Sequence, residues 1–170
     1  MASIQNHTAY LLLGSNLGDR AATLRAAVQQ LNELAGTISS TSSLYETAAW
    51  GLEQQPAFLN QAVQLRTNLP PEVLLDVCLH VEQLAGRERR VRWDARTLDV
   101  DILLYDELVL DSSRLVVPHP ALPQRRFALV PLAEIAATTV HPVFGQTVTE
   151  LLAACTDVLP VTQYYTSEAN

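Results

Sequence analysis

The order of apolar segments in this chain predicts an α+β domain with an antiparallel sheet and two helices on one face. Strand-like and helix-like stretches follow one another as strand, helix, strand, strand, helix, strand over about residues 8–105. Each helix-like stretch repeats its apolar residues every three or four positions and ends at a glycine. This order is that of the split βαβ, or ferredoxin-like, core. We expect the other face of the sheet to be open, where it can carry function.

The first strand and helix are predicted from a short apolar run and the turn that follows it. Residues 8–13 form a buried strand that ends at Gly14. The turn contains a second glycine, Gly18, which suggests a phosphate cradle, but it lacks the Gly-Lys-Ser/Thr ending of a P-loop. A plain strand-to-helix turn is therefore favoured. The helix runs over about residues 19–35, with an apolar stripe of Leu24, Ala27, Val28, Leu31 and Leu34.

Residues 37–67 predict two further strands. The Ser/Thr-rich stretch 37–47 is typical of a more exposed strand, and a polar loop, 48–57, follows it. Residues 58–67 form the third strand, whose side chains alternate between two faces. One face carries Phe58, Asn60, Ala62, Gln64 and Arg66. The opposite face carries Leu59, Gln61, Val63 and Leu65.

A second helix is predicted to begin at Pro70 and Pro71, because proline is tolerated in the first turn of a helix. It continues to Ala85 and stops at Gly86. The residues that this helix turns toward the core are predicted to be Val73, Leu74, Val77, Cys78, Val81 and Leu84.

The fourth predicted strand contains two aspartates, a residue type that is depleted in strands. Its apolar residues, at every second position, are Leu98, Val100, Ile102 and Leu104. Asp99 and Asp101 share the other face, with Cα atoms about 6–7 Å apart. A cation beside both would relieve their repulsion, and magnesium is favoured because it takes one or two carboxylates and fills its shell with water and phosphate oxygens. The alternative is a solvent-facing sheet edge whose acids prevent aggregation.

The pattern after residue 105 is less regular and predicts an extension of the core. The elements expected there are a short hairpin strand at 107–110, an extended segment at 115–120, helices at 127–136 and 148–155, an edge strand at 161–165 and a frayed tail at 166–170. We predict one domain over residues 1–170, with a core at about 8–136 and an extension at 137–165.

Composition indicates a compact cytoplasmic protein. Of the 170 residues, 48% are hydrophobic and only 17% are charged, which is typical of a globular domain. No apolar run approaches the roughly 18 residues of a membrane helix, and residues 1–7 do not resemble a secretory signal. Cys78 and Cys155 lie in apolar helical patterns and are predicted to be buried free thiols in a reducing compartment.

The charged residues indicate an anion site rather than a nucleic-acid surface. A net charge of −7 opposes a broad basic face. All 11 basic residues are arginines, which excludes any lysine-based mechanism and suits two-pronged binding of phosphate. Five of them lie close together just before the two acids, at Arg87, Arg89, Arg90, Arg92 and Arg96. This arginine loop and the acids predict a site for an anion carried with a metal; a solvated charged loop is the alternative.

Four stretches resemble the 6-hydroxymethyl-7,8-dihydropterin pyrophosphokinase family, whose members move a diphosphate from ATP to a pterin alcohol in the folate pathway. They are Arg96-Thr97-Leu98-Asp99-Val100-Asp101-Ile102-Leu103, Gly14-Ser15-Asn16-Leu17-Gly18, Phe58-Leu59-Asn60, and Val117-Pro118-His119-Pro120 followed by Arg125, Phe127 and Pro131-Leu132. Their order and spacing agree with the family from about residue 8 to residue 135.

The resemblance implies a role for each matched position. Asp99 and Asp101 would hold two magnesium ions that bind ATP, while Arg87 and Arg96 would contact the transferred group and neutralise its charge. The residues implied to contact ATP are Glu82, Arg89, Arg96, Ile102, Arg114, His119 and Arg125. The residues implied to form the pterin pocket are Phe58 and Phe127 on the two ring faces, Asn60 at the ring edge, Trp93 closing over it, and the backbone around Thr47 to Trp50.

Several positions depart from the family pattern. Ala48 and Ala49 replace two frequent prolines, and Trp50 replaces a smaller apolar residue. Asp94-Ala95 replaces a frequent Gly-Pro, and Val116 stands where a hydroxyl can meet the nucleotide. Phe58 replaces the usual tyrosine and keeps its ring, and none of these changes removes an expected metal ligand.

The expected activity is transfer of diphosphate from ATP to the pterin, by a monomer that binds neither nucleic acid nor membrane. No side chain stands out as a general base. A nucleotidyl transferase on a ferredoxin-like palm would share the two-metal logic, but it would release pyrophosphate and would not need the Phe58–Phe127 pair. An RNA-binding module would stack bases on the sheet aromatics, which the net charge of −7 opposes.

Overall fold

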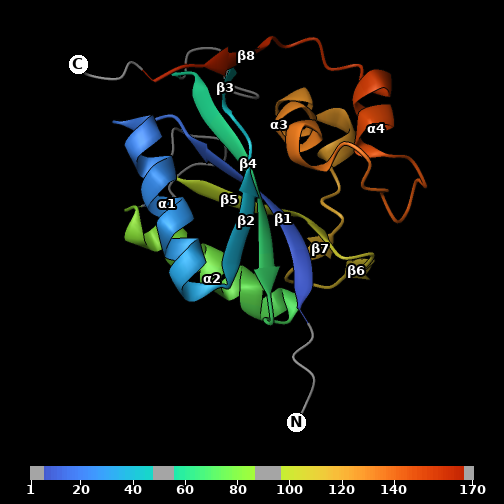
Figure 1. Ribbon diagram of the computed structural model, residues 1–170, viewed down its shortest axis with the longest axis horizontal. Coiled ribbons are helices and arrows are strands. Elements are labelled where there is room, and N and C mark those ends of the chain that lie inside the picture. The colour runs from blue at the N-terminus through green and yellow to red at the C-terminus, as the bar shows by residue number, and fades with distance from the viewer. Residues whose placement is uncertain (1–5, 48–55, 87–96, 167–170) are drawn as a thin grey trace.

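The computed structural model describes residues 6–47, 56–86 and 97–166. The elements of the core are β1 (His7–Ser15), α1 (Arg20–Leu34), β2 (Thr37–Thr41), β3 (Leu44–Thr47), β4 (Phe58–Thr67), α2 (Pro71–Leu84) and β5 (Asp99–Tyr105) (Figure 1). The extension consists of β6 (Leu110–Asp111), β7 (Val116–Val117), a 3-10 turn (Leu122–Gln124), α3 (Arg126–Ala136), α4 (Val148–Ala154) and β8 (Val161–Tyr164).

The main sheet confirms the predicted ferredoxin-like core. Its strands run in the order β5-β1-β4-β3-β8, with β2 also paired to β4, and every pairing is antiparallel. β1 and β4 form the centre, and the C-terminal strand β8 extends the edge beside β3. The side chain of Asp19 caps α1 by accepting from the Ala22 amide, and Pro71 opens α2 as predicted.

The prediction of one strand over 37–47 is wrong, because the segment breaks into β2 and β3 at Ser42. The Ser42 amide donates to the Ala62 carbonyl at 2.8 Å, while Ser42 Oγ accepts from the Ala62 amide at 2.9 Å. The serine hydroxyl therefore takes the place of a backbone acceptor, which satisfies β4 at the break. A register shift between Ile38 and Ser40 adds to the irregularity.

The helix-side core lies between the sheet and the pair α1 and α2. Its fully buried side chains include Leu11, Leu13, Leu24, Leu31, Leu59, Leu65, Leu74 and Leu98. Leu34, Val73 and Leu84 were predicted to face this core but are 47%, 43% and 52% exposed. Each lies in the first or last turn of its helix, where packing neighbours along the helix axis exist on one side only.

The opposite face of the sheet is partly covered, rather than open as predicted. Figure 1 shows α3 and α4 on the other side of the sheet from α1 and α2. Their apolar residues pack on Tyr10, Leu12 and Ala62, and this second cluster includes Leu129 and Leu132. On this face the second cluster ends at Leu12 of β1 and Ala62 of β4. The part of the face beyond them remains for polar residues.

A β-bulge corrects the predicted alternation of β5. Leu11 pairs with Ile102 and Tyr10 with Leu104, so Leu103 is the extra residue. Leu98, Val100 and Ile102 face the helix-side core as predicted, whereas Leu104 belongs to the second cluster. One inserted residue moves every later side chain to the other face.

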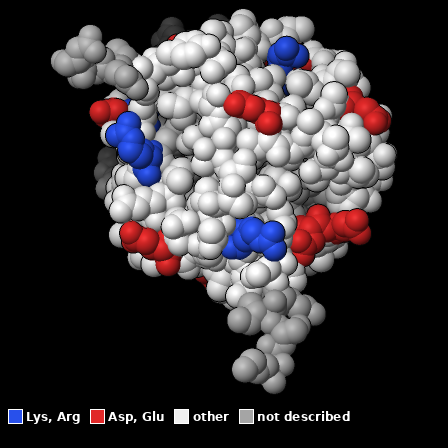
Figure 2. All heavy atoms as spheres, viewed as in Figure 1, with Lys and Arg blue, Asp and Glu red and all other residues white. Residues whose placement is uncertain are grey.

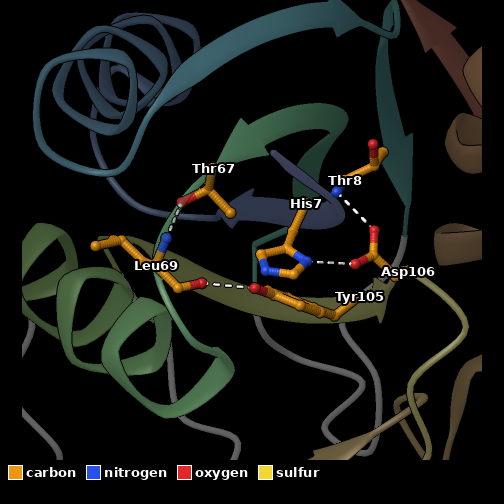
Figure 3. Close-up of polar contacts among 6 residues, drawn as sticks. All are labelled: His7, Thr8, Thr67, Leu69, Tyr105 and Asp106. Carbon is orange, nitrogen blue, oxygen red and sulfur yellow. Dashed lines mark hydrogen bonds and ion pairs between the residues drawn. The ribbon is translucent and has the colours of Figure 1, made fainter. Parts of the chain in front are cut away.

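Polar contacts join β1 and β5 at the end of their ladder where β1 begins and β5 ends (Figure 3). Asp106 Oδ2 lies 2.6 Å from His7 Nδ1, and its Oδ1 accepts from the Thr8 amide at 2.8 Å. The Tyr105 hydroxyl donates to the Leu69 carbonyl at 2.6 Å. This network ties the start of β1 to the end of β5 and to the segment after β4.

The two cysteines differ in burial. Cys78 of α2 is fully buried, as predicted, and burial raises the pKa of its thiol. Cys155 is only half-buried because it follows the last residue of α4, so its prediction is wrong in degree. Within the described residues, no helix is long and apolar enough to cross a membrane.

Candidate active site

Three neighbouring strands align one row of residues at the end of the sheet that lies away from the Asp106 network. Gly14 of β1 pairs with Asn60 of β4 on one side and with Asp99 of β5 on the other. Residues that face each other across antiparallel strands project to the same face. The next row on this face consists of Ala62, Leu12 and Asp101. The apolar half of the face, under α3 and α4, therefore adjoins a polar half.

The missing side chain of Gly14 makes room for Asn60. A Cβ atom at Gly14 would lie 2.8 Å from Asn60 Oδ1 and 3.6 Å from the ring of Phe58. Asn60 is 3% exposed, and its Nδ2 donates to Thr47 Oγ1 at 3.0 Å. Thr47 is also buried and pairs with Phe58 across β3 and β4. The structure thus brings together three residues predicted for the pterin pocket.

Asp99 and Asp101 project from the first half of β5 on the face that carries Asn60. Both are half-exposed, whereas Val100 between them is buried. Within residues 6–47, 56–86 and 97–166 there is no group of three or more metal-binding side chains. Two solvent-accessible carboxylates fit magnesium, which leaves most of its shell to water and phosphate, and they do not fit a closed zinc-type site.

His119 lies near the acids and is held in one tautomer. Its amide donates to the Leu103 carbonyl at 2.9 Å, which places the segment after β7 against β5. Burial and, to a smaller extent, the charge of Arg125 lower the pKa of His119 to about 4, and the charge of Asp99 opposes this shift. The ring is therefore neutral near pH 7. Because Nδ1 accepts from the Ala121 amide at 3.1 Å, the ring proton is on Nε2.

The start of α3 supplies a cation and an aromatic ring. Arg125 immediately precedes the helix, and its Cζ lies 5.6 Å from the centroid of the Phe127 ring. Phe127 packs against the second cluster, on the same side of the sheet as the acids. A guanidinium over an aromatic face is an attractive contact that orients both groups.

Three residues predicted to contact ATP have side chains that contact other parts of the protein. Glu82 of α2 is 3% exposed, and its Oε2 accepts from the Val100 amide at 3.3 Å, at the outer edge of β5. The side chain of Ile102 is in the helix-side core, so only its backbone could meet a nucleotide. Arg114 forms an exposed ion pair with Asp76 of α2, which raises the pKa of the guanidinium.

The remaining predicted residues lie outside the described part of the chain. They are Trp50, Arg87, Arg89, Trp93 and Arg96, together with the family departures Ala48, Ala49 and Asp94. Their roles stay predictions. Val116 is in β7 and is exposed.

Arg20 and Asn16 donate hydrogen bonds to two consecutive carbonyls beside the site, and neither residue was given a role from the sequence. Asn16 Nδ2 donates to the Pro56 carbonyl at 3.2 Å, and Arg20 Nη1 to the Ala57 carbonyl at 2.9 Å. Arg20 Nη2 also lies 2.7 Å from Glu46 Oε2. One signal was present in the sequence: a basic residue at the start of a helix, where the helix dipole disfavours positive charge.

Charged side chains are sparse on the face of the molecule seen in Figure 2. Figure 2 shows isolated arginine and acidic side chains on a largely uncharged face, and the described residues form no broad basic patch there. This distribution agrees with the net charge of −7.

Comparisons with known proteins identify the family of this chain. A model of the family "7,8-dihydro-6-hydroxymethylpterin-pyrophosphokinase (HPPK)" matches residues 10–137. The chain is 47% identical over 131 residues to the 2-amino-4-hydroxy-6-hydroxymethyldihydropteridine pyrophosphokinase of Bacillus subtilis, covering 76% of this chain and 78% of the relative. It is also 47% identical over 146 residues to the protein of that name from Methylorubrum extorquens, covering 85% and 91%.

A solved structure shows the same fold. It is a Plasmodium falciparum HPPK-DHPS triple mutant with pteroate, with a TM-score of 0.71 and 16% sequence identity. The match covers 89% of this chain and 44% of the other, so the present chain spans less than half of that protein.

The family match runs from β1 to α3 and includes every described residue of the candidate site. The protein is an enzyme of the ATP-dependent diphosphotransferase class. Within that class, the chain belongs to the 7,8-dihydro-6-hydroxymethylpterin-pyrophosphokinase family.

Proposed function

We propose that this chain transfers diphosphate from ATP to 6-hydroxymethyl-7,8-dihydropterin, giving the pterin diphosphate and AMP, as a step of folate biosynthesis. The hydroxymethyl oxygen forms the new bond to the β-phosphorus. The bond from that phosphorus to the oxygen bridging the α-phosphate breaks, and AMP leaves with that oxygen and the bonding electrons. The hydroxyl proton is lost to water.

The row of Asn60, Gly14 and Asp99 is the observation that carries this proposal. In this row one strand separates a buried amide that suits a heterocycle from a carboxylate that suits a metal–polyphosphate. A direct transfer needs both substrates held side by side, and positioning of this kind can remove about 7–11 kcal/mol from a barrier. The two ends of the row therefore suit the two substrates of one reaction.

Asp99 and Asp101 would hold the magnesium ions of ATP. Bound there, the metal would neutralise charge on the polyphosphate and orient its oxygens. Two ions are proposed from the resemblance to the family, which implies that both acids are ligands. Arg87 and Arg96, which directly precede this strand in the sequence, would stabilise the remaining charge on the transferred group.

The nucleotide would lie against β5 and the start of α3. His119 is neutral and carries its proton on Nε2, so it can donate a hydrogen bond to the nucleotide without adding charge. Arg125 adds a positive charge beside it, and the backbone of Ile102 lies on the edge strand β5. The other proposed contacts are Glu82, Arg89 and Arg114.

The pterin would lie over Gly14 between the rings of Phe58 and Phe127. Thr47 fixes the amide of Asn60, whose polar atoms can then meet the rim of a flat heterocycle in one orientation. An aromatic contact on each face contributes roughly 0.5–1.5 kcal/mol beyond its buried area. Trp50 and Trp93 would complete the pocket.

The test is nucleotide analysis after incubation with ATP, magnesium and the pterin alcohol. The proposal expects AMP and pterin diphosphate in equal amounts. Release of ADP would indicate transfer of a single phosphoryl group, and release of pyrophosphate would indicate nucleotidyl transfer. Either result, or no turnover, would reject the proposal.

Changes of the two acids separate their function from a role in stability. We expect Asp99→Asn and Asp101→Asn each to lower kcat/KM by at least about a hundredfold, because each removes a charged metal ligand. The metal-free melting temperature of each variant shows whether it is folded, so that a loss of kcat/KM is not a loss of structure. Asp111→Asn, in exposed β6, is the matched control and should leave both quantities unchanged. Activity retained in both site variants would contradict the metal role.

A further inference from the structure

We propose that Arg20 is a positioning residue for the pterin pocket, an inference that rests on the proposed function. It acts by fastening the two strand ends that carry Thr47 and Phe58. Arg20 is the first residue of α1, and it contacts three other parts of the fold. The described residues that it contacts are Ala57, Glu46 and Tyr164, and none of them is a predicted substrate contact.

The guanidinium of Arg20 joins the ends of β3 and β4. Nη1 donates to the carbonyl of Ala57, the residue before β4, at 2.9 Å. Nη2 lies 2.7 Å from Oε2 of Glu46 in β3. Its Cζ lies 5.4 Å from the ring centroid of Tyr164 in β8, which pairs with β3. One side chain therefore links α1 to three strand segments.

Two of these three anchors, Glu46 and Ala57, are each one residue away from the proposed pocket. Glu46 precedes Thr47, and Ala57 precedes Phe58. Thr47 and Phe58 are opposite each other across the β3–β4 pair, and Thr47 accepts the hydrogen bond that orients Asn60. A shift of either strand end would therefore move the Thr47 hydroxyl, the Phe58 ring or both relative to Asn60.

The position of Arg20 is unfavourable for the helix alone. A cation in the first turn of a helix opposes the helix dipole, and Arg20 is only 21% exposed in its side chain. A local preference that is overridden in this way points to a tertiary role. The two-pronged guanidinium suits it, because a lysine ammonium could not reach two acceptors and lie over a ring together.

The experiment compares Arg20→Gln with Arg25→Gln, a control on the exposed face of the same helix. Pterin affinity is measured by calorimetry with a saturating non-hydrolysable ATP analogue and magnesium, and affinity for the analogue is measured without pterin. We expect Arg20→Gln to weaken pterin binding on the order of tenfold, because charge-assisted hydrogen bonds are lost. The affinity for the analogue should change less than twofold, and Arg25→Gln should change neither affinity.

A second pair of variants separates positioning from general destabilisation. Arg20→Lys keeps the charge but loses the fork, so its pterin affinity should lie between those of wild type and Arg20→Gln. Glu46→Gln should weaken pterin binding less than Arg20→Gln, because the bond to Ala57 remains, and the two effects should be non-additive in the double variant.

The outcomes separate this inference from the proposed function. Wild-type protein that neither binds nor converts the pterin would reject the proposed function. Wild-type protein that does so, with Arg20→Gln at wild-type pterin affinity or with equal losses for pterin and analogue, would reject the role of Arg20 alone.

Discussion

Gly14 lies inside β1, where a glycine ordinarily weakens a strand. Its backbone has no left-handed conformation to explain it. The reason is space, because Asn60 Oδ1 and the Phe58 ring occupy the volume of a side chain. At this residue the strand gives up local stability for the placement of two neighbours.

Gly14→Ala should therefore weaken pterin binding on the order of tenfold. The new methyl would meet Asn60 Oδ1 at 2.8 Å and displace it from the orientation that Thr47 sets. Calorimetry with the pterin and an ATP analogue measures the effect. Gly145→Ala is the control: a left-handed backbone strains it by about 1 kcal/mol, but it is open to solvent and outside the site. Equal pterin affinities for Gly14→Ala and wild type would show that the orientation of Asn60 does not determine pterin binding.

His141 is a buried histidine with a structural explanation. Its Nδ1 accepts from the amides of Val143 and Phe144, both at 3.2 Å, and its ring packs on Phe144. Burial lowers the pKa of His141 below its ordinary value of 6.5. The unfolded chain therefore binds more protons than the folded chain just below pH 6.5, and stability falls as the pH drops through that range.

Replacing His141 should remove part of this pH dependence. Asn in place of His141 keeps an acceptor for the two amides but cannot titrate. The difference in unfolding free energy between wild type and His141→Asn, from urea unfolding at several pH values, should shrink or reverse between pH 7.5 and pH 5. His119 contributes with the same sign, and it cancels in this difference. Parallel pH curves for the two proteins would contradict the prediction.

The side chain of Glu134 joins helix α3 to the sheet at the break between β2 and β3. Glu134 accepts from the Ser43 amide at 3.1 Å, from Ser43 Oγ at 2.7 Å and from the Tyr45 hydroxyl at 2.5 Å. Burial opposes ionisation of Glu134, but these hydrogen bonds outweigh it and lower its pKa. Burial together with Glu134 raises the pKa of Tyr45 to about 12. The element that carries Phe127 is thus docked beside the strand that carries Thr47.

Glu134→Ala should lower the free energy of unfolding by about 2 kcal/mol. The change removes charge-assisted hydrogen bonds, and solvent near this exposed site replaces only part of them. Urea unfolding measures the loss. Glu107→Ala, an exposed acid in the turn after β5, is the control and should stay within about 0.5 kcal/mol of wild type. A loss as small as that of the control would show that the Glu134 contacts do not hold α3.

At the scale of the whole molecule, the candidate site and the polar network around Asp106 lie at opposite ends of the sheet. Gly14 and Asp99 pair at one end of the β1–β5 ladder, and Ala9 and Tyr105 pair at the other. A strand rises about 3.3 Å per residue, so the network around Asp106 lies roughly 20 Å from the polar row. Asp106 has a left-handed backbone with φ of 46°, which aspartate tolerates better than most residues.

Asp106→Ala should destabilise the protein and leave its catalysis intact. It removes the contacts to His7 and Thr8 and places alanine in a left-handed turn, for a loss of about 2–3 kcal/mol in urea unfolding. Asp106→Asn keeps the turn and an acceptor, so it should lose less. Below the unfolding transition, kcat/KM for both should equal that of wild type. A large fall in kcat/KM of the folded variant would show that the two ends are coupled.

Much of this fold follows from local pattern. The ferredoxin-like order of the core, the proline start of α2 and the shared face of Asp99 and Asp101 were predicted, because periodicity depends on neighbouring residues. The Leu103 bulge and the break at Ser42 were not, because each depends on the partner strand. The exposure of Leu34 and Leu84 also depends on where the neighbouring elements end.

By itself the sequence determined the order of elements, the two acids on one face of a strand and, by resemblance, the family. Only the tertiary structure decided how α3 covers the second face, how Gly14 makes room for Asn60, and how Arg20 joins the ends of β3 and β4. These features join distant residues: Arg20 and Ala57 are 37 positions apart, and Ser43 and Glu134 are 91. Contacts of that kind depend on how the whole chain packs, which no local pattern contains.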